Sequence, residues 1–146
     1  MTLTPGKALG MAVSIKVQGK KVLVAEDEPD IRGLIAFSLE FAGYKVVQAV
    51  NGEDAIGKAE QEQPDLILLD VRMPKLTGYE ACERLKAKET TKHIPVVFLS
   101  ALSQEAEIRY GLGLGGEEYI IKPFAPDELG LRVTAILERL SRQRAK

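Results

Sequence analysis

Five short apolar segments constrain the fold of this chain more than any other feature of its sequence. Each of them is apolar at several consecutive positions, instead of at every second position. The segments are residues 21–25, 44–47, 65–69, 94–99 and 119–121. A strand that is apolar on both faces must be covered on both faces, as in a parallel sheet between two layers of helices. The pattern therefore predicts five parallel strands.

The longer segments between them carry helix start and stop signals. Pro29 suits the first turn of a helix, and Gly43 suits its end. The side chains expected on the inner face of this helix are Ile31, Leu34, Ile35 and Leu39. The residues expected to cap the next three helices are Asn51, Thr77 and Ser103. Thr77 is followed three residues later by Glu80, which is the spacing of a capping box.

A fifth helix is expected from Pro126 onward, because its apolar residues recur at helical spacing. These residues are Leu129, Val133, Ile136, Leu137 and Leu140. Five strands that alternate with five helices predict an α/β fold, a doubly wound (βα)5 domain over residues 20–143. Residues 1–19 are interpreted as a flexible extension, of which 1–10 need not be native because Met11 can also start the chain. Residues 144–146 are interpreted as a short tail.

Composition argues against several classes of function. The 20 basic and 21 acidic residues give a net charge of -1, which creates no field to hold nucleic acid or an anionic membrane. No apolar segment approaches the roughly 18 to 20 residues needed to cross a bilayer. A single cysteine excludes an internal disulfide and a multi-cysteine metal site, and it fits a reducing compartment. We therefore expect a cytoplasmic protein.

Polar residues with useful chemistry follow four of the predicted strands. Glu26 and Asp27 follow the first strand, Asp70 the third, Ser100 the fourth and Lys122 the fifth. Ligands of open parallel sheets bind at the carboxyl ends of the strands, and right-handed connections bring these ends to one edge. The sequence therefore predicts that three carboxylates, a hydroxyl and an ammonium group converge there.

A cluster of three carboxylates needs cations. At a separation of a few ångströms each pair repels by about 2–4 kcal/mol at an effective dielectric constant of ~20. Lys122 supplies one positive charge, and Mg2+ suits the remaining set of oxygen ligands because it keeps several waters and accepts a phosphate oxygen. A carboxylate that attacks phosphorus in such a site forms an acyl phosphate. The residues thus favour phosphoryl chemistry.

Four segments of the sequence resemble the motifs of the receiver domain of two-component response regulators. They are residues 22–32, 64–74, 96–101 and 119–124, in the order in which that family has them. The resemblance implies the flavodoxin-like fold and strand order 2-1-3-4-5 that are known for the family. It also implies that Asp70 accepts a phosphoryl group from a phosphohistidine on a sensor histidine kinase or a phosphotransfer protein.

The resemblance further implies a role for each polar residue. The Mg2+ ligands would be Glu26, directly or through water, Asp27, Asp70 and the backbone carbonyl of Arg72. Ser100 and Lys122 would contact the phosphoryl group. Movement of Ser100 would let Tyr119 rotate and change the face made by the fourth helix, fifth strand and fifth helix, where a downstream effector binds. Phosphorylation can also produce a homodimer, whereas direct contact with nucleic acid or a membrane is not expected.

The sequence departs from the common pattern of this family in three places. Glu26 stands where the family usually has Asp, and Thr77 stands where it often has Asp. Residues 115–118 read Gly-Gly-Glu-Glu instead of Gly-Ala-Asp-Asp. Together with Gly111 and Gly113 they weaken the fourth helix, because an interior Gly costs roughly 1 kcal/mol relative to Ala. We expect this helix to be short or frayed.

The residues present argue against three other functions. A Mg2+-dependent phosphatase with an aspartyl-phosphate intermediate needs a second Asp two residues after Asp70, where this chain has Arg72. A nucleotide binder needs a phosphate-binding loop after the first strand, where this chain has residues 26–28, Glu-Asp-Glu. A receiver that serves only as a scaffold gains no support, because the expected side chains are present. No function is expected of His93 or Cys82. The sequence leaves open whether the receiver stands alone or is the N-terminal part of a longer regulator.

Overall fold

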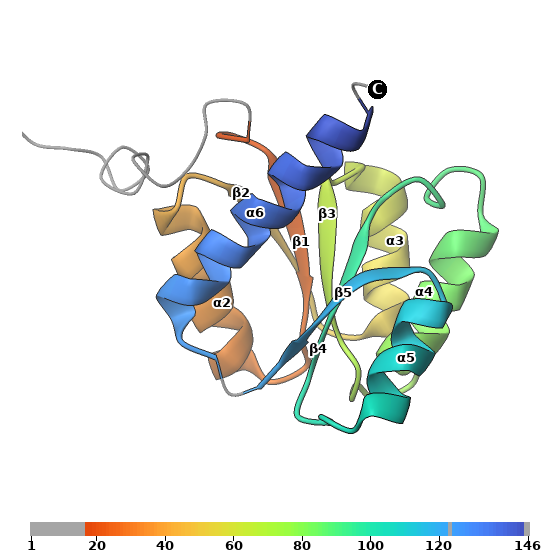
Figure 1. Ribbon diagram of the computed structural model, residues 1–146. Helices are drawn as coiled ribbons and strands as arrows, with labels where there is room; N and C mark the ends of the chain where they lie inside the picture. Colours follow the sequence, from red (N-terminus) through yellow and green to blue (C-terminus); the bar gives the residue numbers. More distant parts are fainter. Residues whose placement is uncertain (1–16, 123, 145–146) are drawn as a thin grey trace, which may run out of the picture.

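The computed structural model describes residues 17–122 and 124–144, which form a sheet covered by helices on both faces (Figure 1). The strands are β1 (Lys21–Ala25), β2 (Lys45–Ala49), β3 (Leu66–Asp70), β4 (Val96–Ser100) and β5 (Gly116–Ile121). The helices are α2 (Pro29–Phe41), α3 (Gly52–Glu62), α4 (Gly78–Ala87), α5 (Glu105–Gly113) and α6 (Pro126–Arg144). None of these helices has both the length and the apolar character that a membrane span requires.

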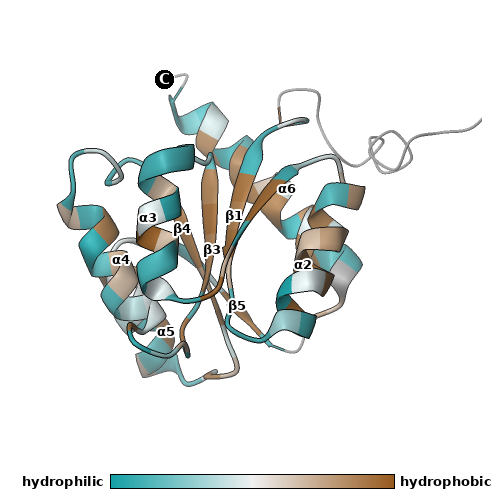
Figure 2. Ribbon diagram, turned by 180° about the vertical axis from the view of Figure 1, so that it is seen from behind, coloured by the Kyte–Doolittle hydropathy of each residue, from teal (hydrophilic) through white to brown (hydrophobic). Residues whose placement is uncertain are grey.

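The sheet is parallel throughout, with strand order β2-β1-β3-β4-β5. This confirms the predicted fold class and the order that the family resemblance implied. Consecutive residues of a strand enter opposite layers, as the apolar segments required. Val22 and Val24 of β1 pack with α2 and α6, whereas Leu23 and Ala25 pack with α3 and α4. Figure 2 shows the apolar strands between helices of mixed hydropathy, and α2 also carries exposed apolar residues such as Phe37.

The start of β5 differs more from the prediction than any other strand end. The strand begins at Gly116, and residues 116–118 pair with Val96 and Val97 of β4 through an irregular register. The sequence pattern missed this part because Glu117 and Glu118 are polar. Since β5 lies at the edge of the sheet, these side chains reach solvent and approach arginines of α6.

Two of the three predicted helix caps are confirmed. Asn51 Oδ1 accepts a hydrogen bond from the backbone N–H of Asp54 at 2.7 Å. The backbone N–H of Glu80 donates to Thr77 Oγ1 at 3.2 Å, and Glu80 accepts from the N–H of Thr77 at 3.1 Å, which completes the capping box. The prediction for Ser103 is wrong, because α5 begins at Glu105 and its N-cap is Gln104, which makes no side-chain cap.

The predicted inner face of α2 is only partly correct. Ile35 and Leu39 are buried, together with Ala36, but Ile31 and Leu34 are 37% and 51% exposed. This helix carries more apolar residues than the sheet can cover. Ile31 lies in the first turn of α2, and Leu34 lies about 100° around the helix from Ile35. The sheet therefore covers only the stripe of residues 35, 36 and 39.

Packing of the domain begins upstream of residue 20, where the domain was predicted to start. Val17 is buried among the residues between the sheet, α2 and α6. The rest of the predicted extension, residues 1–16, lies outside the described residues, as do residues 145–146 of the predicted tail. Helix α5 has nine residues, fewer than any other described helix, in agreement with its predicted shortness.

Candidate functional site

The carboxylates predicted at the ends of β1 and β3 meet at one edge of the sheet, the lower edge in Figure 1. One carboxylate oxygen each of Glu26, Asp27 and Asp70 lies within 4.8 Å of the others. Glu26 and Asp70 are buried, and Asp27 is half-buried. This proximity follows from the parallel register, in which Ala25 pairs with Leu69 immediately before the two acidic positions.

A single ammonium group bridges two of these carboxylates. Lys122 Nζ lies 2.7 Å from Glu26 Oε1 and 2.9 Å from Asp70 Oδ2. The backbone N–H of Lys122 donates to the carbonyl of Ser100 at 2.8 Å, which fixes the start of this side chain at the end of β4. The Lys122 side chain is 21% exposed, so its charge acts in a partly desolvated site, where it is screened less than at the surface.

The electrostatics of the site show an excess of negative charge. Burial, followed by the interaction with Asp70, raises the pKa of Glu26 to about 7, although Lys122 opposes this shift. Burial alone would lower the pKa of Lys122, but its hydrogen bonds to Glu26 and Asp70 raise it above the ordinary value. Three carboxylates against one ammonium leave room for a divalent cation, and an all-oxygen set of ligands fits Mg2+.

The backbone around Asp70 leaves no room for a side chain at Gly78. The backbone N–H of Gly78 donates to the carbonyl of Val71 at 2.8 Å. A Cβ atom at Gly78 would collide with the backbone oxygen of Asp70 and would lie 2.8 Å from Val71 Cα. The N–H of Arg72 donates to Asp70 Oδ1 at 3.0 Å. The sequence pattern gave no sign of this requirement, because it depends on how closely the loop after β3 approaches the start of α4.

Ser100 lies next to Asp70 across the sheet. Asp70 pairs with Leu99, which puts Ser100 one residue further toward the same edge. Ser100 is buried, and its Oγ accepts a hydrogen bond from the N–H of Leu102 at 3.0 Å. The hydroxyl proton of Ser100 remains available to an acceptor at the acidic edge. The structure thus brings the side chains of Glu26, Asp27, Asp70 and Lys122 together, and it places Ser100 at the end of the neighbouring strand.

Arg32 was not considered as a site residue from the sequence, yet it supports the acidic loop. Its Nη1 donates to the carbonyl of Glu26 at 2.8 Å and lies 3.5 Å from that of Asp27. Its Nε donates to Gln48 Oε1 at 3.3 Å. The guanidinium therefore holds the loop that carries both acidic side chains. A basic residue one turn into a helix can reach back to the loop that precedes the helix. This spacing could have identified Arg32 from the sequence.

Tyr119 is buried in the layer formed by the sheet with α3, α4 and α5, and it is 9% exposed. The Tyr119 hydroxyl lies 3.1 Å from the hydroxyl of Tyr79. The sequence pattern did not indicate a role for Tyr79. His93 is exposed just before β4, at the edge opposite the acidic cluster, and Cys82 is buried. Neither reaches the site, as expected.

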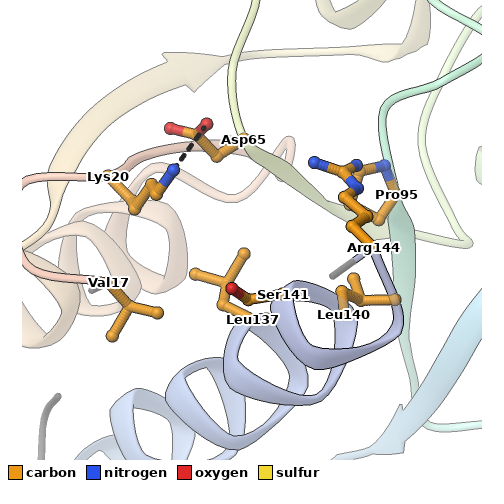
Figure 3. Close-up of a pocket in the computed structure, with 8 residues that line it drawn as sticks. All are labelled: Val17, Lys20, Asp65, Pro95, Leu137, Leu140, Ser141 and Arg144. Atoms are coloured by element: carbon orange, nitrogen blue, oxygen red, sulfur yellow. Dashed lines mark ion pairs between the residues drawn. The ribbon is translucent and has the colours of Figure 1, made fainter. Parts of the chain in front are cut away.

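A small pocket of about 120 Å3 lies at the opposite edge of the sheet (Figure 3). Lys20, Asp65 and Pro95, which precede β1, β3 and β4, line one side, and the last turns of α6 line the other. Lys20 Nζ lies 3.7 Å from Asp65 Oδ1. None of the predicted site residues lines this pocket, so it is separate from the acidic site.

Comparisons with known proteins agree with this geometry. Residues 22–134 match the family model described as the response regulator receiver domain. The chain is 46% identical over 120 residues to the alkaline phosphatase synthesis transcriptional regulatory protein PhoP of Bacillus subtilis, covering 82% of this chain and 49% of that protein. It is 43% identical over 122 residues to the DNA-binding dual master transcriptional regulator RpaA of Synechocystis, covering 84% and 51%.

A solved structure is similar over nearly its whole length. The receiver domain of the Francisella response regulator 1452 superposes with a TM-score of 0.78 at 33% identity, covering 84% of this chain and 99% of that one. In contrast, the chain spans about half the length of the curated relatives described above. The similarity to those relatives therefore concerns one part of each longer protein.

Proposed function

This chain belongs to the response regulator receiver family, and on that premise we propose that its Asp70 accepts a phosphoryl group from a phosphohistidine. The donor is a sensor histidine kinase or a phosphotransfer protein. The observation that carries the proposal is the convergence of Glu26, Asp27 and Asp70 around one ammonium group, from Lys122. Buried like charges at the end of parallel strands are costly, which favours a functional reason for their presence.

Asp70 is oriented for attack. The N–H of Arg72 binds Oδ1 and the ammonium group of Lys122 binds Oδ2, so the plane of the carboxylate is fixed from both sides. In the transfer, an Asp70 oxygen forms a bond to phosphorus while the bond from phosphorus to the donor imidazole nitrogen breaks. The leaving nitrogen keeps the electron pair, and the product is an acyl phosphate.

Mg2+ fits the donor set of this site. The groups that would hold it are the carboxylates of Glu26, Asp27 and Asp70 and the backbone carbonyl of Arg72. When bound, a divalent cation stabilises the negative charge on the transferring phosphoryl oxygens. Glu26 carries one more methylene than the Asp usual in the family, and its Oε2 also accepts from the N–H of Glu28 at 3.2 Å.

Lys122 and Ser100 assist the same step. The ammonium group of Lys122 can move from the Glu26 and Asp70 carboxylates to a phosphoryl oxygen without leaving the site, because it already contacts both. The Ser100 hydroxyl donates a hydrogen bond to another phosphoryl oxygen. The chain is thus a phosphoryl acceptor that assists its own phosphorylation and slow dephosphorylation, and it does not process a separate substrate.

The output of the proposed switch is the face made by α5, β5 and α6. Movement of Ser100 toward the phosphoryl group opens space into which Tyr119 rotates, and this rotation repacks α5 against the sheet. Large apolar side chains of these three elements are exposed, which suits binding of a downstream effector or of a second copy after phosphorylation. They are Tyr110, Leu112, Ile121 and Leu131.

The proposed receiver acts in the cytoplasm. It contacts neither nucleic acid nor a membrane itself, in keeping with its net charge of -1. The relatives PhoP and RpaA are transcriptional regulators of about twice the matched length, so regulation of transcription through a further domain is one use of such a receiver, and action as a stand-alone receiver is the other.

The phosphatase alternative is disfavoured by Arg72. A second Asp at this position would have to donate a proton to the leaving group, and a guanidinium cannot do so at neutral pH. The backbone N–H of Arg72 donates to Asp70 Oδ1, which supports a role of this position in orienting the proposed acceptor.

Beryllofluoride, which resembles a phosphoryl group, tests the proposal. With Mg2+ and beryllofluoride we expect 19F resonances of a bound anion in the wild-type chain, and their loss in Asp70→Asn. Asp30→Asn, at an exposed position in the first turn of α2, serves as the matched control and should behave as wild type. Absence of bound resonances in the wild type, or equal binding by Asp70→Asn, would contradict the proposed function.

A further inference from the structure

The hydroxyl of Tyr79 joins three elements that border the proposed output face. It lies on α4, and it donates to Glu107 Oε2 of α5 at 2.9 Å. It also lies 3.1 Å from the hydroxyl of Tyr119 on β5. One oxygen atom therefore connects α4, α5 and β5.

The direction of these hydrogen bonds follows from the number of protons. An ionised carboxylate only accepts hydrogen bonds, so the single proton of the Tyr79 hydroxyl points to Glu107. The Tyr79 oxygen must then accept a hydrogen bond from the Tyr119 hydroxyl. Partial burial, with the interactions to Tyr119 and Glu107, raises the pKa of Tyr79 above its ordinary value, so this hydroxyl keeps its proton. The result is a directed chain from Tyr119 through Tyr79 to Glu107.

Aromatic rings pack on both sides of Tyr79 and support this chain of hydrogen bonds. The Tyr79 ring meets Phe98 at a centroid distance of 5.3 Å and an angle of 71°, and Tyr110 at 5.0 Å and 82°. Both geometries are the favourable edge-to-face type. The backbone also approaches closely: a Cβ atom at Gly111 would lie 3.1 Å from the Phe98 ring and 3.2 Å from the Tyr119 ring. Tyr119 is thus confined between the sheet and α5.

We propose that Tyr79 is a positioning residue that, through Glu107, holds Tyr119 in its buried orientation and ties the first turn of α5 to α4. This latch, defined as Tyr79, Glu107 and Tyr119, acts before any phosphoryl group is present. It sets how often Tyr119 leaves the buried position that it occupies in this structure, which is the position from which the proposed switch would rotate it. That this position controls signalling rests on the proposed function, but the latch itself does not.

The latch predicts a specific effect of a single oxygen atom. Tyr79→Phe keeps the ring and its edge-to-face contacts but removes the hydroxyl. Because one such hydrogen bond contributes about 1 kcal/mol, which is a factor of about five in a population, the exposed population of Tyr119 should rise about three- to tenfold. Tyr110→Phe is the matched control, since the Tyr110 ring packs on Tyr79 and this residue is 53% exposed.

The test uses 19F NMR of the full chain labelled with 3-fluorotyrosine. The four tyrosines give four resonances, which are assigned with single Tyr→Phe variants. Exposure of Tyr119 is measured as the broadening of its resonance by a soluble paramagnetic agent. We expect about three- to tenfold more broadening in Tyr79→Phe, a similar increase in Glu107→Ala, and no further increase in the double variant. Tyr110→Phe and Glu105→Ala should leave Tyr119 unchanged.

An unchanged Tyr119 resonance in Tyr79→Phe would overturn the latch. An equal increase in Tyr110→Phe would also overturn it, because it would indicate general loosening of the aromatic packing. Additive effects of Tyr79→Phe and Glu107→Ala would likewise contradict a single chain of hydrogen bonds. Beryllofluoride added to the same samples gives its own bound resonances. Their absence in the wild type contradicts the proposed function alone, whereas their presence with an unresponsive Tyr119 contradicts the latch alone.

Discussion

The ammonium nitrogen of Lys122 lies 2.9 Å from Oδ2 of Asp70, although 52 positions separate the two residues in the chain. Lys122 follows β5 at one edge of the sheet, whereas Asp70 ends the central strand β3. The contact spans β4, whose last residue, Ser100, binds the backbone of Lys122. The strand order therefore determines that the proposed phosphoryl acceptor and its cationic partner meet.

Glu26 should make the protein less stable as the pH rises from about 4.5 to about 7. The unfolded chain ionises this group near the ordinary value of 4.5, whereas the folded chain ionises it at about 7. Between these values the folded state binds more protons, so the free energy of unfolding falls with pH, by about 3 kcal/mol from this group. We expect Glu26→Gln to remove that part of the pH dependence.

Urea unfolding in the absence of Mg2+ at about pH 5 and about pH 8 measures this difference. Glu53→Gln, at an exposed position of α3, provides the control and should keep the wild-type pH dependence. If Glu26→Gln also keeps it, burial of Glu26 does not raise its pKa as described.

Gly78→Ala should destabilise the fold by about 1–3 kcal/mol, the usual range for an overpacked site. The added Cβ meets the backbone of Asp70 and Val71, which cannot yield as a flexible side chain would. Gly57→Ala is the matched control: no atom lies within 4 Å of its Cβ position, and Ala should stabilise α3 by about 0.5–1 kcal/mol. Thermal unfolding of both variants checks the prediction, which fails if Gly78→Ala melts at or above the wild-type temperature.

The amides of residues 108–114 should exchange with solvent faster than those of α4 in the unphosphorylated chain. Gly111 and Gly113 weaken α5, and Gly111 is its only buried residue, so little packing compensates. Hydrogen exchange measured by NMR gives the comparison. Gly113→Ala should slow the exchange, because its Cβ position is open. Strong protection across residues 108–114 in the wild type would exclude a frayed helix.

The sequence predicted the architecture because the chemistry of each element is local. Fully buried parallel strands require consecutive apolar residues, and caps such as Asn51 and Thr77 depend on neighbours a few positions away. The convergence of Glu26, Asp70 and Lys122 followed from topology, since parallel strands place their carboxyl ends together. These features could be inferred without knowing any side-chain position.

Other features depend on packing between elements and could not be inferred in this way. Apolar periodicity alone did not show that Ile31 and Leu34 lie outside the area that the sheet covers. The hydroxyl contacts of Tyr79 required the relative placement of α4, α5 and β5. The steric requirement at Gly78 depends on the path of the loop after β3, which no local pattern encodes.

Phosphorylation by a small donor shows whether Asp70 accepts a phosphoryl group. The chain is incubated with acetyl phosphate and Mg2+, and its intact mass is measured, followed by identification of the modified residue after borohydride reduction of the acyl phosphate. We expect the wild type to gain one phosphoryl group on Asp70 and Asp70→Asn to gain none, while Asp30→Asn behaves as wild type. No gain of mass in the wild type, or an equal gain in Asp70→Asn, would show that Asp70 is not the phosphoryl acceptor.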